Sequence, residues 1–160
     1  MWELQNLKRD DEYNTPKYAW ENIKHLLPKD KIIWEAFYAD GKSGDYLKEL
    51  GFNVTQGKID FFNDETLPEY DIIVSNPPYS ICKKIMPRLL KLDKPFILLM
   101  PSCKINTSYF REYKDSGLQI IIPRKRIHFI KNGIQTTGCS FDCFYYCYKM
   151  NLKKDISWLE

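Results

Sequence analysis

Short apolar runs alternate along this chain with segments of helical period. The apolar runs are rich in β-branched and aromatic residues and end at turn residues, so each of them predicts a buried strand. They lie at residues 31–35, 52–55, 71–74, 94–100, 118–122 and 141–150, and residues 59–62 predict a further short extended piece.

Between these runs, apolar residues recur at helical spacing. The pattern predicts helices over residues 17–27, 43–50, 80–92 and 107–116. Thr15 is expected to cap the first helix and Pro16 to open its first turn, while Gly51 and Gly117 end the second and the fourth. This alternation predicts an α/β fold, a mostly parallel sheet with helices on both faces. No helix separates the last two strands, so an antiparallel C-terminal strand is expected.

Length and composition indicate one ordinary globular domain. The chain has 160 residues, 44% hydrophobic and 28% charged, with a net charge of +3 that is weak evidence for a polyanionic partner. Residues 1–14 have the composition of a disordered polar arm, which leaves residues 15–160 as the folded domain. No apolar run approaches a membrane span and the N-terminus lacks a signal pattern, so we expect no membrane partner.

Five cysteines, an odd number without framework spacing, favour a reducing compartment. Cys139, Cys143 and Cys147 recur every four residues, which is not a zinc pattern. In a strand this spacing puts all three on one face, so we interpret them as core residues and expect no metal site. The expected location is the cytoplasm of a bacterium or of a cell infected by a phage or virus, or the nucleus if the virus is eukaryotic.

The most informative positions are Asn76-Pro77-Pro78-Tyr79, directly after the apolar run 71–74. Two prolines hold the backbone in a fixed extended turn. An amide and an aromatic ring are thereby held at the carboxyl end of a strand, where open α/β sheets bind ligands. This arrangement suits a flat group that carries an amine. The alternative is a proline-rich loop with an incidental asparagine.

Two further segments have the chemistry of a ligand site. The strand-to-helix turn 35–44 contains Gly41, which allows a ligand close to the backbone and the helix N-terminus, although Asp40-Gly41 is also a common turn. Asp60-Phe61-Phe62 offers a carboxylate for an amine and aromatic rings for a flat base. A turn aspartate beside two core phenylalanines is equally compatible with that segment.

A basic and aromatic segment covers residues 123–138. Three adjacent cations beside aromatic residues suit a phosphate backbone and a flipped base, and a solvated basic turn is the alternative. The candidate nucleic-acid-binding residues are Arg124, Lys125, Arg126, Phe129 and Lys131. His128 could be read as a general base, but we favour a structural role for it.

In this order, the segments resemble those of the S-adenosylmethionine-dependent amino-methyltransferases of the NPPY type, above all the γ group of DNA N6-adenine methyltransferases. The resemblance covers about residues 15–150 and implies a Rossmann-like methyltransferase fold with S-adenosyl-L-methionine as cofactor. Asp40 stands where the family usually has a loop glycine. No acidic residue is evident for the cofactor ribose, and Gln56 lies near the expected place.

The resemblance also implies roles for individual residues. Asn76 and the Pro77 carbonyl would accept hydrogen bonds from the target amine, Tyr79 would stack on the base, and Phe129 would help to hold it. The implied cofactor-binding residues are Thr15, Pro16, Glu35, Phe37, Gly41, Ser43, Asp60, Phe61 and Phe62.

The predicted function is therefore methyl transfer to N6 of adenine in DNA, on a flipped or single-stranded base. No separate target-recognition domain is evident, so a homodimer or a partner subunit could supply recognition. RNA bases or a protein glutamine remain alternative substrates. A non-catalytic nucleic-acid-binding subunit is the alternative from a different class, because the cofactor turn departs from the family pattern.

Overall fold

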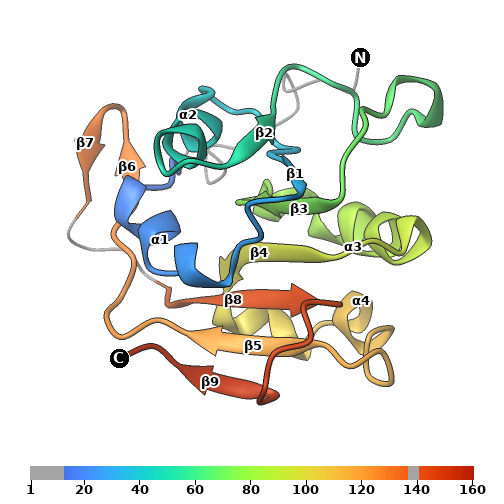
Figure 1. Ribbon diagram of the computed structural model, residues 1–160. Coiled ribbons are helices and arrows are strands. Elements are labelled where there is room, and N and C mark those ends of the chain that lie inside the picture. The colour runs from blue at the N-terminus through green and yellow to red at the C-terminus, as the bar shows by residue number, and fades with distance from the viewer. Residues whose placement is uncertain (1–12, 137–140) are drawn as a thin grey trace.

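A seven-stranded sheet forms the centre of the computed structural model, which describes residues 13–136 and 141–160 (Figure 1). The strand order is β2-β1-β3-β4-β8-β5-β9. All strands run parallel except β8, which is antiparallel to both β4 and β5. The strands are β1 (Ile32–Trp34), β2 (Asn53–Thr55), β3 (Ile72–Ser75), β4 (Phe96–Pro101), β5 (Gln119–Ile122), β8 (Cys143–Tyr148) and β9 (Ile156–Trp158).

The predicted fold class is confirmed, and each of the six predicted strands is present with bounds that differ by no more than two residues at either end. The antiparallel strand β8 does not close the sheet at its edge, because it is inserted between β4 and β5. The C-terminal strand β9 was not predicted and runs parallel to β5. A separate hairpin of β6 (Ile130–Lys131) and β7 (Ile134–Gln135) was also missed, and residues 59–62 form a turn where an extended piece was expected.

Helices cover both faces of the sheet (Figure 1). They are α1 (Lys17–Glu21), α2 (Lys42–Glu49), α3 (Cys82–Leu92) and α4 (Ser108–Arg111), with 3-10 turns at Lys24–Leu26, Asp64–Thr66, Tyr79–Ile81 and Ser102–Asn106. The expected first and last helices are therefore shorter than the sequence pattern suggested. Pro16 occupies the N-cap position of α1, and no side chain forms a capping hydrogen bond there. The capping role predicted for Thr15 is therefore wrong.

The core consists of two clusters, one on each face of the sheet. Strand β4 contributes to both, because side chains alternate along a strand: Ile97 and Leu99 pack toward α1 and α2, whereas Phe96, Leu98 and Met100 pack toward α3 and α4. Cys143 and Cys147 are buried on a single face, as predicted for core cysteines, while Cys139 lies outside the described residues.

Two further expectations concern the described part of the chain. None of its helices is long and apolar enough to cross a membrane. None of its histidine, cysteine and acidic side chains gathers into a group that could hold a metal ion. Tyr13 and Asn14, which were assigned to the polar arm, belong to the fold, since Asn14 forms a β-bridge with Ile130.

Candidate active site

The site follows from the strand order. Successive parallel strands run from β1 outward to β2 on one side and to β3 on the other, so the chain reverses direction across the sheet between β1 and β3. The carboxyl ends of strands at such a switch point form the usual ligand crevice of an open α/β sheet. Glu35 follows β1 and Asn76 follows β3, so both lie at this switch point. We call the edge where the parallel strands end the carboxyl edge.

Glu35 and Ser75 form the buried base of the site. Ser75 Oγ donates a hydrogen bond to Glu35 Oε1, and both side chains are fully buried. Glu35 Oε2 has no hydrogen-bond partner among the described residues. Burial raises the pKa of the Glu35 carboxyl to about 8, against smaller lowering effects of the bond from Ser75 and of the Phe37 backbone. The acid therefore stays largely protonated at neutral pH until a cation approaches it.

Asn76 is held in a defined orientation. Its Nδ2 donates to the backbone carbonyl of Tyr13 at 3.2 Å. A carbonyl oxygen can only accept, so the amide must point its nitrogen toward Tyr13. The opposite atom, Oδ1, is buried and has no hydrogen-bond partner among the described residues. Pro77 and Pro78 are buried beside it and fix the backbone of the turn.

Aromatic side chains lie around Asn76. The ring of Tyr79 is edge-on to Phe141 at 5.7 Å, and its hydroxyl donates to the Leu99 carbonyl at 3.4 Å. Tyr13 packs edge-on against both Phe141 and Phe129. Phe129 is fully buried, so it supports this cluster from beneath, and the described conformation does not present its ring to a base as the sequence analysis expected.

The turn after β1 approaches its neighbours closely at two glycines. Gly41 has φ +80°, and a side chain there would overlap the ring of Tyr38. Gly44, in the first turn of α2, lies directly under Gln56, whose amide nitrogen donates to Asp45 at 2.7 Å. Gln56 Oε1 is buried and has no partner among the described residues. An acceptor is therefore present at the carboxyl end of β2, where the family usually has an acid.

Two other residues of this turn are anchored from outside it. Phe37 is buried against Phe61, with ring centroids 4.9 Å apart. Ser43 Oγ accepts a hydrogen bond from the indole of Trp20 in α1 at 3.2 Å. The structure thus brings the predicted residues of the 35–44 turn and Phe61 together at the switch point.

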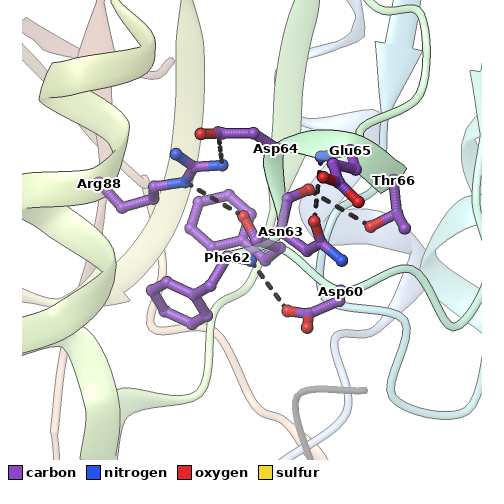
Figure 2. A network of polar contacts seen from close by, with 8 residues as sticks. Asp60, Phe62, Asn63, Asp64, Glu65, Thr66 and Arg88 are labelled. Carbon is purple, nitrogen blue, oxygen red and sulfur yellow. Dashed lines mark hydrogen bonds and ion pairs between the residues drawn. The ribbon is translucent and has the colours of Figure 1, made fainter.

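The loop that carries Asp60 is held in place by α3 (Figure 2). Asp60 Oδ1 accepts a hydrogen bond from the Phe62 backbone at 3.0 Å, which closes a tight turn. Arg88 of α3 donates to the Phe61 carbonyl at 3.2 Å and forms an ion pair with Asp64 at 2.7 Å. Phe61 is buried and Phe62 is half-buried next to it. Arg88 was not predicted, and no local pattern marks it.

Thr15 and Pro16 lie close to this site through the segment that precedes them. The Asn14 backbone is bonded to Ile130 in both directions at 2.8 Å, and the Tyr13 carbonyl contacts Asn76. Thr15 is buried, and its Oγ1 has no hydrogen-bond partner among the described residues. The hydroxyl is therefore available to a ligand, although it does not cap the helix.

Half of the buried side-chain polar atoms without a hydrogen-bond partner in the described residues, four of eight, lie at this site. Most buried polar groups in proteins are hydrogen-bonded, so each exception needs an explanation. Four such atoms in the described residues belong to the switch point or the segment next to it: Thr15 Oγ1, Glu35 Oε2, Gln56 Oε1 and Asn76 Oδ1. Three are acceptors and the fourth is a hydroxyl. Glu35, Gln56 and Thr15 fit the ammonium, a ribose hydroxyl and the carboxylate of a nucleoside–amino acid conjugate such as S-adenosylmethionine, and Asn76 Oδ1 remains for a different donor.

The predicted nucleic-acid-binding residues do not form a single surface. Lys131 lies over the ring of Tyr13, 5.0 Å from its centroid, near Asn76. Arg126 is paired with Asp142 at 2.7 Å on the surface. Arg124 and Lys125 line a different groove, which also contains the end of β9.

Tyr13, Phe141 and Ser75 are functional candidates that the sequence analysis assigned no role. Tyr13 and Phe141 are brought to Asn76 only by the fold, and their spacing in the chain gives no signal. Ser75 was visible as the residue before Asn76, but its bond to a carboxyl group forty positions away was not.

Comparisons with known proteins show that solved structures resemble this chain. No protein-family model matches the chain, and no curated protein sequence matches it. A Listeria monocytogenes structure assigned as a class I S-adenosylmethionine-dependent methyltransferase is 10% identical, covers 97% of this chain and 68% of its own, and has a TM-score of 0.55.

Two further solved structures have TM-scores below 0.5, and no conclusion is drawn from them. Precorrin-6Y C5,15-methyltransferase of Geobacter metallireducens is 17% identical, with 89% and 97% of the two chains covered and a TM-score of 0.47. A dimethyladenosine transferase of Plasmodium falciparum is 11% identical, with 85% and 62% covered and a TM-score of 0.46. The strand order and the Listeria structure together show the Rossmann-like fold of class I methyltransferases.

Proposed function

We propose that this protein is an S-adenosylmethionine-dependent methyltransferase that acts on the exocyclic N6 of adenine in DNA. The observation that carries the proposal is the orientation of Asn76, whose nitrogen is committed to the Tyr13 carbonyl while its buried oxygen has no partner among the described residues. An oxygen presented in this way accepts a hydrogen bond and cannot donate one, so it suits an amine.

Asn76 would activate the amine by changing its geometry. The lone pair of an amine on an aromatic base is delocalised into the ring, which makes the nitrogen a poor nucleophile. Hydrogen bonds from its two protons to Asn76 Oδ1 and to the Pro77 carbonyl would favour a pyramidal nitrogen with a localised lone pair. Both acceptors belong to a rigid turn, so little reorganisation is needed when charge develops on the nitrogen.

The residues at the switch point have the chemistry needed to hold the cofactor. Glu35 would accept the ammonium of the methionine part, and Thr15 would donate to its carboxylate. Gln56 would accept from a ribose hydroxyl. Asp60 would accept from the adenine amine, with the half-buried ring of Phe62 packed against the base. When bound, S-adenosylmethionine would supply an electrophilic methyl group on a sulfonium, which becomes a neutral thioether on transfer.

Transfer of this kind depends on alignment of the acceptor nitrogen with the methyl group, and it needs neither a metal nor a strong base. The chain contributes alignment through the buried prolines and through Tyr79, which would stack on the target base. An adenine paired in a duplex cannot reach this position, so the base must be flipped out or single-stranded.

The test is a methylation assay with labelled S-adenosylmethionine on DNA, RNA and a glutamine-containing release-factor-like protein, followed by identification of the modified residue. N6-methyladenine in DNA is the expected product. A product only in RNA or protein would replace the proposed substrate and keep the chemistry. Absence of cofactor binding at millimolar concentration in calorimetry would contradict the enzyme and favour a non-catalytic subunit.

A matched pair of variants tests the role of Asn76. Asn76→Ala should lower the methylation rate by about 10²–10³-fold, the usual effect of removing one preorganised hydrogen bond to a reacting group. Cofactor affinity should change little, because Asn76 contacts the acceptor and not the cofactor. Asn53→Ala, at the exposed start of β2 on the opposite edge of the sheet, is the control and should be active. Full activity of Asn76→Ala would refute the mechanism.

A further inference from the structure

A groove lies at the carboxyl edge near the ends of β5 and β9, away from the 35–44 turn. It has a volume of about 480 Å³ and is lined by residues of α1 and the 3-10 turn after it, of the segment after β5 and of the end of β9. We call it the C-terminal groove and define it by Tyr18, His25, Arg124, Lys125, Trp158 and Glu160. None of these residues has a role in the cofactor or catalytic site described above.

The groove presents an aromatic ring to solvent. Trp158 is the last residue of β9 and remains 67% exposed, the second most exposed large apolar side chain among the described residues. Its position is fixed by the sheet, because it pairs in register with Ile122 and the next residue, Leu159, donates to the Ile122 carbonyl at 3.0 Å. An aromatic ring on a fixed backbone, with much of its surface open to water, is suited to stacking on a flat partner.

Two cations lie beside this ring. Arg124 and Lys125 follow β5 directly, are exposed, and have no ion-pair partner in the described part of the chain. Arg126, the next residue, is different because it is paired with Asp142. Glu160 is the one acidic residue that lines the groove, and it would oppose an anionic ligand.

The strand directions place this groove on the same edge as Asn76. Strands β3, β5 and β9 run parallel to one another, so Ser75, Ile122 and Trp158 all end at the carboxyl edge. Four strand spacings separate β3 from β9, which corresponds to roughly 19 Å at about 4.8 Å each. A stacked nucleic-acid strand would cover that span in about six nucleotides at 3.4 Å per step.

We propose that the C-terminal groove binds a single-stranded flank of the nucleic-acid substrate, with a base stacked on Trp158 and phosphates on Arg124 and Lys125. An exposed aromatic ring beside cations is the combination that binds single strands without sequence readout. The link to the target base rests on the proposed function, whereas binding of the strand in this groove does not.

The alternative occupant is a second copy of this chain paired along β9. That strand is only three residues long, and short edge strands offer few backbone groups for pairing. A second copy also does not explain why two cations lie beside the ring. Nucleic acid accounts for the charge and the aromatic ring together.

The first experiment measures binding of fluorescein-labelled single-stranded DNA of twelve nucleotides by anisotropy, without cofactor. Trp158→Ala should weaken binding roughly tenfold, as expected for loss of one base stacked on an aromatic ring, and Trp158→Phe should restore most of the affinity. Ile156→Ala, an exposed apolar residue on the same strand, is the control and should bind like the parent. Circular dichroism of each variant confirms that it is folded.

The second experiment measures the dependence of affinity on salt. For single strands each phosphate contact contributes about 0.7 to the slope of log K against log salt, so Arg124→Ala with Lys125→Ala should reduce the slope by about 1.4. Lys153→Ala with Lys154→Ala removes two exposed cations at the opposite end of β9 and should leave the slope unchanged. Glu160→Gln should strengthen binding.

The source of the strand and the link to Asn76 are tested separately. The same twelve-nucleotide sequence is compared as DNA and as RNA, and the tighter ligand identifies the source. Methylation of a four-nucleotide DNA should be insensitive to Trp158→Ala, because so short a strand cannot span both sites. Asn76→Ala should still bind the longer strand through the groove. If the parent protein binds the strand normally but methylates neither DNA nor RNA, that result counts against the proposed function alone.

Two results would overturn the inference. One is unchanged affinity and salt slope for both DNA and RNA in the Trp158→Ala and the Arg124→Ala with Lys125→Ala variants. The other is a dimer in light scattering that Trp158→Ala converts to a monomer, since that would assign the groove to a second copy of the chain.

Discussion

Replacing Glu35 by glutamine tests the electrostatics on which the candidate site depends. Glu35 is fully buried, with one oxygen bonded to Ser75 and the other without a partner among the described residues. Its pKa is raised from 4.5 to about 8, mainly by burial. Glutamine has nearly the same shape and can accept the bond from Ser75, but it does not ionise.

The magnitude follows from the change in pKa. At 1.36 kcal/mol per pH unit, moving from 4.5 to about 8 corresponds to about 5 kcal/mol. The folded protein binds this proton more tightly than the unfolded chain, so the contribution to stability is fully present below pH 4.5 and is lost as pH rises to about 8. The glutamine in Glu35→Gln does not titrate and makes no pH-dependent contribution to stability. The stability of the variant relative to the parent must therefore increase with pH.

The assay is urea unfolding of the parent and of Glu35→Gln at pH 5.5 and pH 8.5. The difference in the free energy of unfolding should widen by roughly 3 kcal/mol between these values, in favour of the variant. Glu112→Gln, an exposed acid that follows α4, is the control and should keep a constant difference. If the parent and Glu35→Gln change in parallel, the carboxyl is not desolvated and the reasoning fails.

The same experiment with bound cofactor connects the pKa of Glu35 to function. A ligand ammonium next to Glu35 would lower its pKa, so saturating S-adenosylmethionine should reduce the pH-dependent difference and release a proton on binding near pH 7. Calorimetry in two buffers with different ionisation enthalpies measures that proton. Binding without proton release would place the ammonium away from Glu35.

Two other substitutions test how the cofactor residues are positioned. In Gly44→Ala the new methyl group would overlap Gln56 and displace it, which should weaken cofactor affinity roughly tenfold by loss of a hydrogen bond. The same substitution in a Gln56→Ala background should cause no further loss of affinity. A further loss there would exclude Gln56 as the cause. Arg88→Met should lower the free energy of unfolding by about 1 kcal/mol and should weaken adenosine binding, because the Phe61 carbonyl loses its hydrogen bond. Lys91 is an exposed cation on the same helix, and Lys91→Met should have neither effect. Equal effects of the two substitutions would refute the anchoring role of Arg88.

The predicted elements agree with the structure where local patterns decide. Strands β3 and β4 are buried at every position and almost entirely apolar, because strands in the middle of a sheet are covered on both faces. The edge strand β9 has two exposed apolar residues and lies in a polar segment, so its pattern did not stand out. The lengths of α1 and α4 were overestimated because helical spacing persists beyond them, into a 3-10 turn after α1 and into successive turns after α4.

The candidate site was predicted only where its residues form a local pattern in the sequence. Asn76 could be recognised because two prolines and a preceding strand are local features. The basic segment 124–131 looked continuous along the chain, but the fold sends Arg124 and Lys125 to the groove with Trp158 and Lys131 to Tyr13. The direction of a side chain in a loop depends on the elements that surround it, which are distant in the chain.

The sequence by itself determined six of the nine described strands, the positions of the helices and the rigid turn of Asn76, because each depends on residues that are close together in the chain. Only the tertiary structure decided the strand order, which places Glu35 beside Ser75, Tyr13 beside Asn76, and Trp158 beside Arg124. These pairs are far apart in the chain and meet because the packing of the two core clusters selects one arrangement of the strands.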